Sequence, residues 1–442
     1  MVSRSPIGQS VPRREGAEKV TGAAKYTDDL VFPGAWYGKT VRSTIPAGRL
    51  RSISLDPAFD WSSVVVVTAD DIPGENVVHL IRDDQPVLAR LGGEIRHKEE
   101  PVLLLAGPDR ASVEEAARHI RIEYDKATPV YDLDKATEVY STIEISKGKV
   151  VEDVKGVEVV QRTFRVGLQE QLYIEPQGAI AIPEAGGAIR VVGSLQCPYY
   201  VHRALKRALK LTDAQAIVVQ AETGGGFGGK EEYPSMVAIH AALLARKAER
   251  PVRLIYDRHE DLAATTKRHP GVITHRTTVG KDGTLLAQDI EIVLDGGGYC
   301  TLTPVVLSRA AIHAAGPYSC PNVWIRARAV ATNTPPNGAF RGFGAPQSLF
   351  AAELMVEHVA ADPRSTCRAA RHVERGSAAE MDVAPRRHHR DRSEADRKRW
   401  KRDGVGCCPE GRCDRPTVRP SDRPSRSGPL PRLPRLRLHR QW

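Results

Sequence analysis

The pattern of apolar and polar positions divides the chain into short strands and a few helices. Two apolar runs, 64–67 and 102–105, predict buried strands, and residues 109–119 have the spacing of an amphipathic helix. Residues 120–124 then alternate apolar with charged side chains, the period of two that is typical of a half-buried strand. The stretch 17–135 is therefore predicted to form a mixed α+β module.

A second α+β domain is predicted over residues 150–360, after a link at 132–149. The same periodicities place strands at 157–166, 188–192, 216–221, 252–256 and 284–294. They place one helix at 200–210, a second that begins directly after the glycine run at 223–231, and a third at 348–359. No internal repeat is present in either domain.

The basic charge of the chain is concentrated at one end. Of 442 residues 41% are hydrophobic, which is enough to build cores and excludes a fibrous or wholly disordered protein. Residues 361–442 hold 22 Lys and Arg against 11 Asp and Glu, whereas residues 1–360 hold 42 against 43. This Arg/Pro-rich segment predicts a disordered tail, and its abrupt onset is typical of out-of-frame translation. It lacks interleaved aromatics and paired Cys-x-x-Cys motifs, so no specific nucleic-acid partner is expected.

No membrane span is predicted, because no run of 18 uncharged apolar residues occurs. The arm 1–16 has no hydrophobic segment of the kind that a signal peptide needs, so a cytoplasmic location is expected. Residues 1–360 contain only Cys197, Cys300 and Cys320, which are too widely spaced to hold an iron–sulfur cluster. This scarcity of cysteine fits a reducing compartment.

The glycine run is the most informative motif and allows three interpretations. It fits the phosphate-binding pattern G-x-x-x-x-G-K, but Glu231 stands where that motif needs a Ser or Thr hydroxyl. From Gly224 to Gly229 it also fits G-x-G-x-x-G, with Asp257 beyond the next strand, so an NAD-dependent dehydrogenase is an alternative. The third interpretation is that the glycines only allow a helix to pack closely on a sheet. Backbone N–H groups at a helix N-terminus would favour an anion.

Two further loops carry polar groups suited to a large, oxygen-rich ligand. One spans residues 337–347 and combines spaced glycines with Arg341 and Phe343. The other spans residues 193–200 and places the amide of Gln196 between a predicted strand and a predicted helix.

With these loops and the segments 16–29 and 169–177, the chain resembles the molybdopterin-binding large subunit of the xanthine dehydrogenase and aldehyde oxidase family over residues 1–360. The resemblance implies an α+β fold with an a/b hammerhead domain at 17–135, followed by the first half of a molybdopterin-binding domain at 150–360. It also implies a molybdenum-pterin cofactor in this chain, and [2Fe–2S] clusters and FAD on an iron–sulfur subunit and an FAD subunit of a heteromer.

The resemblance assigns cofactor contacts residue by residue, with no protein side chain as a direct metal ligand. Gln196 would approach the molybdenum through its side-chain amide, and Phe227 and Arg341 would contact the metal centre through backbone N–H groups. Gly225 and Gly226 would admit the cofactor because they lack side chains.

The resemblance also implies a substrate site. Glu231 would orient the substrate, Arg309 would stabilise negative charge developing on a heterocycle, and Phe343 would stack on a flat ring. These residues favour hydroxylation of a purine-like or other aromatic N-heterocycle with water as the oxygen source. Alternatives are an aldehyde oxidoreductase and an aromatic acyl-CoA reductase; the carbon monoxide dehydrogenase branch is disfavoured because the loop 339–347 has no cysteine.

The matching pattern stops near residue 360, although the family's cofactor domain continues for several hundred residues. The general base is expected in that further part, so it has no candidate in this chain. The resemblance therefore predicts a truncated chain, and an inactive remnant is an alternative to an active subunit.

Overall fold

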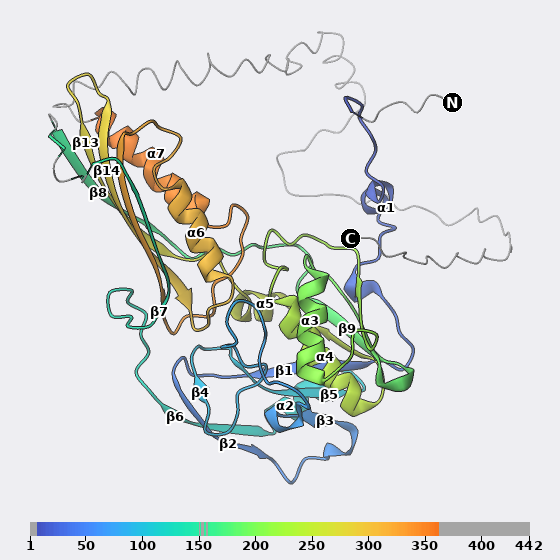
Figure 1. Ribbon diagram of the computed structural model, residues 1–442. Coiled ribbons are helices and arrows are strands. Elements are labelled where there is room, and N and C mark those ends of the chain that lie inside the picture. Colours follow the sequence, from blue (N-terminus) through green and yellow to red (C-terminus); the bar gives the residue numbers. More distant parts are fainter. Residues whose placement is uncertain (1–6, 150, 152–153, 156–157, 362–442) are drawn as a thin grey trace, which may run out of the picture. The chain divides into compact units, whose positions relative to one another are not determined.

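The computed structural model describes residues 7–149, 151, 154–155 and 158–361, and these residues lie in one unit of the chain (Figure 1). The predicted tail, from residue 362 on, lies outside the described residues. The α-helices of the described part are α1 (Gly16–Thr21), α2 (Arg110–Arg118), α3 (Pro198–Leu209), α4 (Pro234–Ala248), α5 (Arg258–Ala264), α6 (Thr303–His313) and α7 (Ala345–Ala361).

A seven-stranded mixed sheet unites both halves of the described chain. Its strands, in spatial order, are β11 (Ala216–Gln220), β10 (Ile189–Gly193), β9 (Gly178–Pro183), β12 (Val252–Ile255), β1 (Trp36–Arg42), β5 (Pro101–Gly107) and β3 (Val65–Val67). β1 pairs in parallel with β12 at Trp36↔Val252 and Tyr37↔Arg253. The two predicted α+β domains therefore share one continuous sheet, which sequence periodicity did not indicate.

Strand β5 shows why the apolar run at 102–105 has no alternation. Leu104 packs into the cluster that includes α4, whereas Leu103 and Leu105 pack with Val113 of α2 on the other face. A strand covered by helices on both faces reads as a continuous hydrophobic run. Helix α4 is itself buried from Pro234 to Ala245, because it lies between this sheet and α3.

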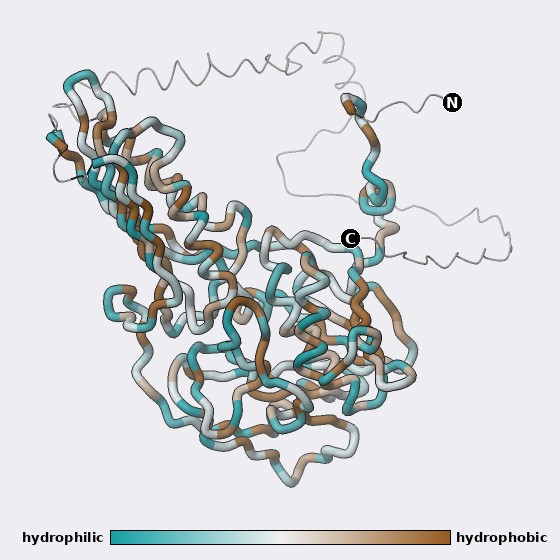
Figure 2. The backbone as a smooth tube through the Cα atoms, viewed as in Figure 1, coloured by the Kyte–Doolittle hydropathy of each residue, from teal (hydrophilic) through white to brown (hydrophobic). Residues whose placement is uncertain are grey.

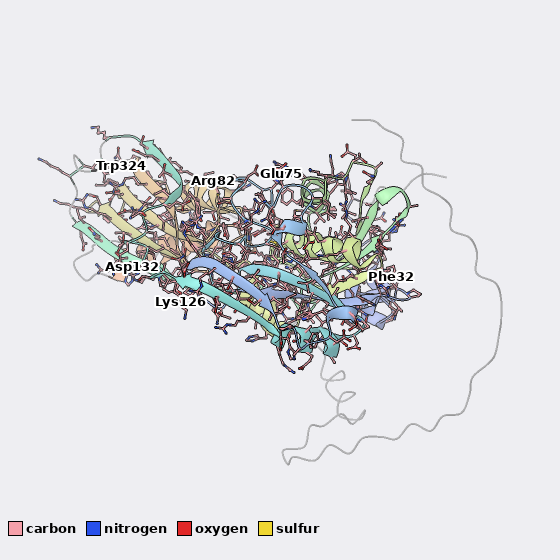
Figure 3. All side chains as sticks on the ribbon, turned by 90° about the horizontal axis from the view of Figure 1, so that it is seen from below. Phe32, Glu75, Arg82, Lys126, Asp132 and Trp324 are labelled. Atoms are coloured by element: carbon pink, nitrogen blue, oxygen red, sulfur yellow. The ribbon has the colours of Figure 1, made fainter. Side chains whose placement is uncertain are left out.

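A five-stranded sheet carries helices on one face only. Its spatial order is β7 (Val139–Lys147), β15 (Asn322–Ala331), β14 (Leu285–Gly297), β13 (Gly271–Val279) and β8 (Glu158–Val166). Helices α6 and α7 lie side by side over its apolar face, and hydrophobic and hydrophilic residues alternate along its strands (Figures 1 and 2). Trp324, which is labelled in Figure 3, lies on the opposite face, and its indole donates to Glu144 over 2.7 Å. One covered and one solvated face is the usual arrangement of such sheets.

A third, three-stranded sheet completes the first module: β4 (Glu94–Ile95), β2 (Gly48–Leu55) and β6 (Ile120–Lys126). The predicted helix at 109–119 is confirmed as α2, whose N-cap Asp109 accepts a hydrogen bond from the Ser112 N–H group. Such a cap fixes where a helix starts.

Two expectations about boundaries were wrong. The predicted link at 132–149 contains strand β7, because Ile143 and Ile145 alternate with polar residues and pair with Ala327 and Ile325 of β15; the five-stranded sheet therefore begins before residue 150. The glycine run does not open helix α4, which begins only at Pro234.

Truncation of Leu244 in α4 tests this account of the core. Leu244 is fully buried against β1, where an added Cβ on Gly38 would lie 3.0 Å from its Cδ1 atom. We expect Leu244→Ala to lower the free energy of unfolding by about 2–5 kcal/mol through lost burial and a cavity. The matched control Leu91→Ala removes a leucine that is 61% exposed and should change it by less than about 0.5 kcal/mol. Thermal unfolding followed by circular dichroism measures both, and equal effects would contradict the packing described.

Candidate functional site

The glycine run forms a compact loop between β11 and α4 that bonds largely to itself. The N–H group of Gly229 donates to the Gly226 carbonyl over 2.8 Å, and that of Glu231 donates to the Gly228 carbonyl over 3.1 Å. Gly225 and Gly228 have φ near +100°, which glycine adopts without a steric penalty. The glycine run ends at Glu231, three residues before α4 begins at Pro234, so its N–H groups do not form a helix N-terminus.

A buried ion pair anchors this loop from beneath. The Glu175 carboxylate accepts hydrogen bonds from Lys230 Nζ (2.9 Å), the Ser194 hydroxyl (2.6 Å) and the Gly224 N–H group (2.7 Å). Its other oxygen accepts from the Thr27 N–H group over 3.1 Å. Burial raises and Lys230 lowers the pKa of Glu175, and the net shift is downward. One carboxylate therefore joins both ends of the glycine loop to the first module.

The direction of Lys230 excludes the phosphate-binding interpretation. A P-loop lysine reaches phosphates outside the loop, but the Lys230 side chain is fully buried and points inward to Glu175 and over the Tyr173 ring. The dinucleotide interpretation is also wrong. Asp257, its proposed ribose ligand, caps helix α5 by accepting from the Glu260 N–H group, and the glycines are separated from α4. The NAD-dependent alternative therefore lacks both of its structural elements.

Gln196 lies on the glycine loop, as its position between β10 and α3 predicts. Its side-chain oxygen accepts hydrogen bonds from the N–H groups of Gly228 (2.9 Å) and Lys230 (3.3 Å). A Cβ on Gly226 would lie 2.4 Å from that oxygen, so only glycine fits there. The oxygen is thus held inward, and the NH2 group of this exposed residue has no partner among the described residues.

Phe227 forms the outer tip of the loop. It has φ +52°, an uncommon conformation for a non-glycine residue, and its side chain is 48% exposed. Its carbonyl accepts from the Arg341 N–H group over 2.8 Å, and within the described part of the chain its own N–H group has no acceptor. Such strain at an exposed loop tip is typical of functional sites.

The second loop, residues 337–347, packs back to back with the glycine loop. Besides the Phe227–Arg341 bond, the Ala339 carbonyl would lie 2.6 Å from a Cβ on Gly228, and it accepts from the Gln171 side chain over 2.8 Å. Arg268 stacks over Phe340, 3.9 Å from the ring centroid, and donates to the Arg341 carbonyl. The Arg341 N–H group is therefore engaged by Phe227 in this structure rather than free to contact a metal centre.

The predicted substrate residues lie on three different elements, namely the end of the glycine run, the second loop and helix α6. Glu231 is half-buried, and burial raises the pKa of its carboxyl group. Phe343, with φ +53°, packs partly against the apolar cluster of α6 and α7. Arg309 is exposed on α6, and the second loop reaches that helix at Gly344, where a Cβ would lie 2.1 Å from the Val306 carbonyl.

Contacts thus bring together Gln196, Gly226, Phe227 and Arg341, with Glu231 at the base of the same loop. No contact among the described residues joins Arg309 to Glu231, so their shared role in binding a substrate stays a prediction. The structure adds residues that the motifs did not single out: Glu175, Gln171, Arg268 and Glu232. Gln171 and Glu175 stand in the segment 169–177 that carries the resemblance, but their partners are distant in the sequence, so no local pattern marks their roles.

Two family models match the chain. Residues 131–365 match the molybdopterin cofactor-binding domain, and residues 21–128 match the aldehyde oxidase and xanthine dehydrogenase a/b hammerhead domain. The chain belongs to the molybdopterin-binding subunits of the xanthine dehydrogenase and aldehyde oxidase family. The predicted family and fold class are confirmed, and the relatives are molybdenum hydroxylases.

Among curated proteins, the chain is 33% identical to the nicotinate dehydrogenase large molybdopterin subunit of Eubacterium barkeri, over 77% of this chain and 83% of that one. It is 34% identical to a probable xanthine dehydrogenase subunit of Bacillus subtilis, over 78% of this chain but only 48% of the relative. The chain therefore spans most of one relative and about half of the other.

Among solved structures, the aldehyde oxidoreductase of Desulfovibrio gigas matches with a TM-score of 0.72 and 25% identity, over 80% of this chain and 42% of that one. Quinoline 2-oxidoreductase of Pseudomonas putida 86 matches with a TM-score of 0.67 and 27% identity, over 77% and 46%.

Neither a cluster of metal-binding side chains nor a membrane-spanning helix occurs among the described residues. No group of three or more His, Cys, Asp or Glu side chains within residues 7–361 is arranged to hold a metal ion. None of the helices in the described ranges is long and apolar enough to cross a membrane.

Replacing Lys230 tests the anchor of the glycine loop. Lys230→Met keeps the apolar stem but leaves the Glu175 carboxylate buried without its cation, which should destabilise the protein by about 3–5 kcal/mol. The control Lys39→Met breaks the surface pair with Glu114, whose loss should cost about 0–1 kcal/mol. Denaturant unfolding measures the difference, and equal midpoints for the two variants would show that the buried pair is not an anchor.

Proposed function

We propose that this chain is the molybdenum-cofactor-binding subunit of a hydroxylase that oxidises a purine-like or other aromatic N-heterocycle, with water as the oxygen source. The observation that carries the proposal is the junction of two glycine loops through the Phe227–Arg341 hydrogen bond, with the amide of Gln196 fixed on it. The family membership of the chain supports the same reaction class.

The residues at this junction fit a molybdenum-pterin cofactor. The Phe227 N–H group and the Gln196 NH2 group are donors without partners in the described part, and donors of this kind suit oxygen atoms on an anionic group. Gly226 leaves room for the Gln196 side chain, which any larger residue would displace. When bound, the cofactor supplies a redox centre that accepts the two electrons removed from the substrate.

The chain's own residues would bind and orient the substrate. The half-buried Glu231 carboxyl group, whose pKa is raised by burial, can share a proton with a ring nitrogen of a heterocycle. Phe343 would stack on the flat ring. Arg309, on helix α6, would stabilise the negative charge that develops on the heterocycle during its hydroxylation. No base is assigned among the described residues.

The relatives favour a heterocyclic substrate. The names of three of them refer to nicotinate, xanthine and quinoline, which are flat nitrogen-containing rings. An aldehyde is the second candidate, because the chain also shares its fold with an aldehyde oxidoreductase at 25% identity. Measuring the activity of the native complex on nicotinate, xanthine and an aromatic aldehyde distinguishes a heterocyclic substrate from an aldehyde substrate.

The electrons must leave through other redox groups, and we propose that these lie on partner subunits. The three cysteines of the described residues are unpaired, and Cys300 and Cys320 are buried on the second half of the fold. The proposal therefore includes an iron–sulfur subunit and an FAD subunit in a cytoplasmic heteromer. Purification from the native host should recover them with this chain.

Substitution of Gly226 tests the cofactor site. A Cβ there would meet the Gln196 oxygen at 2.4 Å, so Gly226→Ala should displace the amide and lower molybdenum per chain at least about tenfold in the purified native complex, equivalent to a loss of about 1.4 kcal/mol. Gly167→Ala is the matched control, because a Cβ at Gly167 meets nothing within 4 Å.

Metal analysis by mass spectrometry gives the readout, with circular dichroism to confirm that both variants are folded. Wild-type complex and Gly167→Ala should contain near one molybdenum per chain. Folded wild-type complex without molybdenum would refute the proposed function and favour the inactive remnant. Full occupancy of Gly226→Ala would show that the cofactor binds elsewhere.

A further inference from the structure

Glu232 is a buried acidic residue beside the two loops of the cofactor site. It follows Glu231 directly, but its side chain turns inward and is 2% exposed. Its Oε1 atom accepts a hydrogen bond from the Ala339 N–H group over 3.0 Å. Glu232 therefore links the segment after the glycine loop to the second loop.

The second loop is fitted closely to this carboxyl group. A Cβ on Gly338 would lie 1.6 Å from Glu232 Oε1, so the loop backbone passes directly over it. The Ala339 carbonyl is held on its other side by Gln171, and the Gly338 N–H group donates to the Lys267 carbonyl over 2.9 Å. Two residues further on, Arg341 makes its bond to Phe227. The position of Ala339 thus sets the junction of the two loops.

No cation balances Glu232 among the described residues. The neighbouring Lys267 directs its ammonium group to Glu170 (2.8 Å) and to Thr265, and Arg268 directs its guanidinium to Gln169 and to the second loop. His269, also buried beside Gly338, is neutral because burial lowers its pKa to about 3.

The Thr266 hydroxyl and the Ala339 N–H group favour the charged form of Glu232, but burial outweighs both and raises its pKa. The side-chain oxygen of Asn337, at the start of the same loop, is buried without a hydrogen-bond partner in the described structure. An unpaired carboxylate in such surroundings is unfavourable, whereas a neutral carboxyl group costs much less to bury.

We propose that Glu232 is a positioning residue of the cofactor site, whose buried carboxyl group holds the Gly338–Ala339 peptide and thereby sets the contact between Arg341 and Phe227. The importance of this contact for catalysis rests on the proposed function, but the positioning of the loop does not. Opening of the second loop should depend on pH, because it exposes this buried carboxyl group. Burial, reinforced by the charge of Glu231, raises the pKa of Glu232 from 4.5 to about 8.

Glu232 keeps its proton when the second loop is closed and releases it when the loop opens, so a rise in pH favours the open loop. Between about pH 5 and 8 each unit of pH favours opening by up to about tenfold, and above pH 8 the effect levels off. Glu232→Gln keeps the acceptor and the shape but cannot ionise, so its loop should stay closed across this range. Glu232→Ala removes the acceptor and should open the loop at every pH.

Hydrogen–deuterium exchange of peptides covering residues 337–347, corrected for the intrinsic pH dependence of exchange, measures loop opening in the full chain. We expect protection in the wild type to fall relative to Glu232→Gln as pH rises from 5 to 8, and to be lowest in Glu232→Ala. Glu291→Gln, which changes an exposed glutamate on β14, serves as the control and should follow the wild type.

Parallel pH profiles for the wild type and Glu232→Gln would overturn the proposal, as would unchanged protection in Glu232→Ala. If Glu232→Ala does not fold, the comparison of wild type with Glu232→Gln still decides. Because exchange needs no cofactor, it can be measured on protein that contains no molybdenum. A complex without molybdenum would refute the proposed function and leave this result standing.

Discussion

The structure around the candidate site depends on one buried ion pair, Glu175–Lys230. The carboxylate contacts the start of the glycine loop at Gly224, its end at Lys230, and the first module at Thr27. Burying two charges is costly unless their partners are well placed, and here Ser194 bonds to both of them. With the loop fixed from beneath, its outer atoms at Gln196 and Phe227 have defined positions before any ligand binds.

The Glu175–Lys230 pair explains why the glycine run is neither a phosphate-binding loop nor a dinucleotide-binding loop, although its glycine spacing fits both. The lysine that would bind a phosphate is used inside the fold, and the glycines serve close contacts with Gln196 and Ala339 rather than with a helix N-terminus. The second loop then holds Phe227 in place, because the Arg341 N–H group donates to the Phe227 carbonyl. A preorganised set of donors results, as electrostatic binding of an anionic cofactor requires.

Much of the fold could be predicted from periodicity, and the limits have physical causes. Helix α2 and strand β5 were recognisable because amphipathic spacing and an apolar run are local signals. Strand β7 and the sheet shared through β1 and β12 were not, because strand pairing joins residues far apart in the sequence. At the site, motifs identified Gln196 and Phe227, whereas Glu175 and Glu232 act through burial and distant partners that no motif displays.

The most direct test of this account is to locate the metal itself. Crystals of the native complex, measured at the molybdenum absorption edge, should give one anomalous peak per chain beside the Gln196 side chain and the Phe227 N–H group, above the loop that Glu175 and Lys230 anchor. A peak elsewhere, or none in a folded complex, would contradict the assignment of the two glycine loops as the cofactor site.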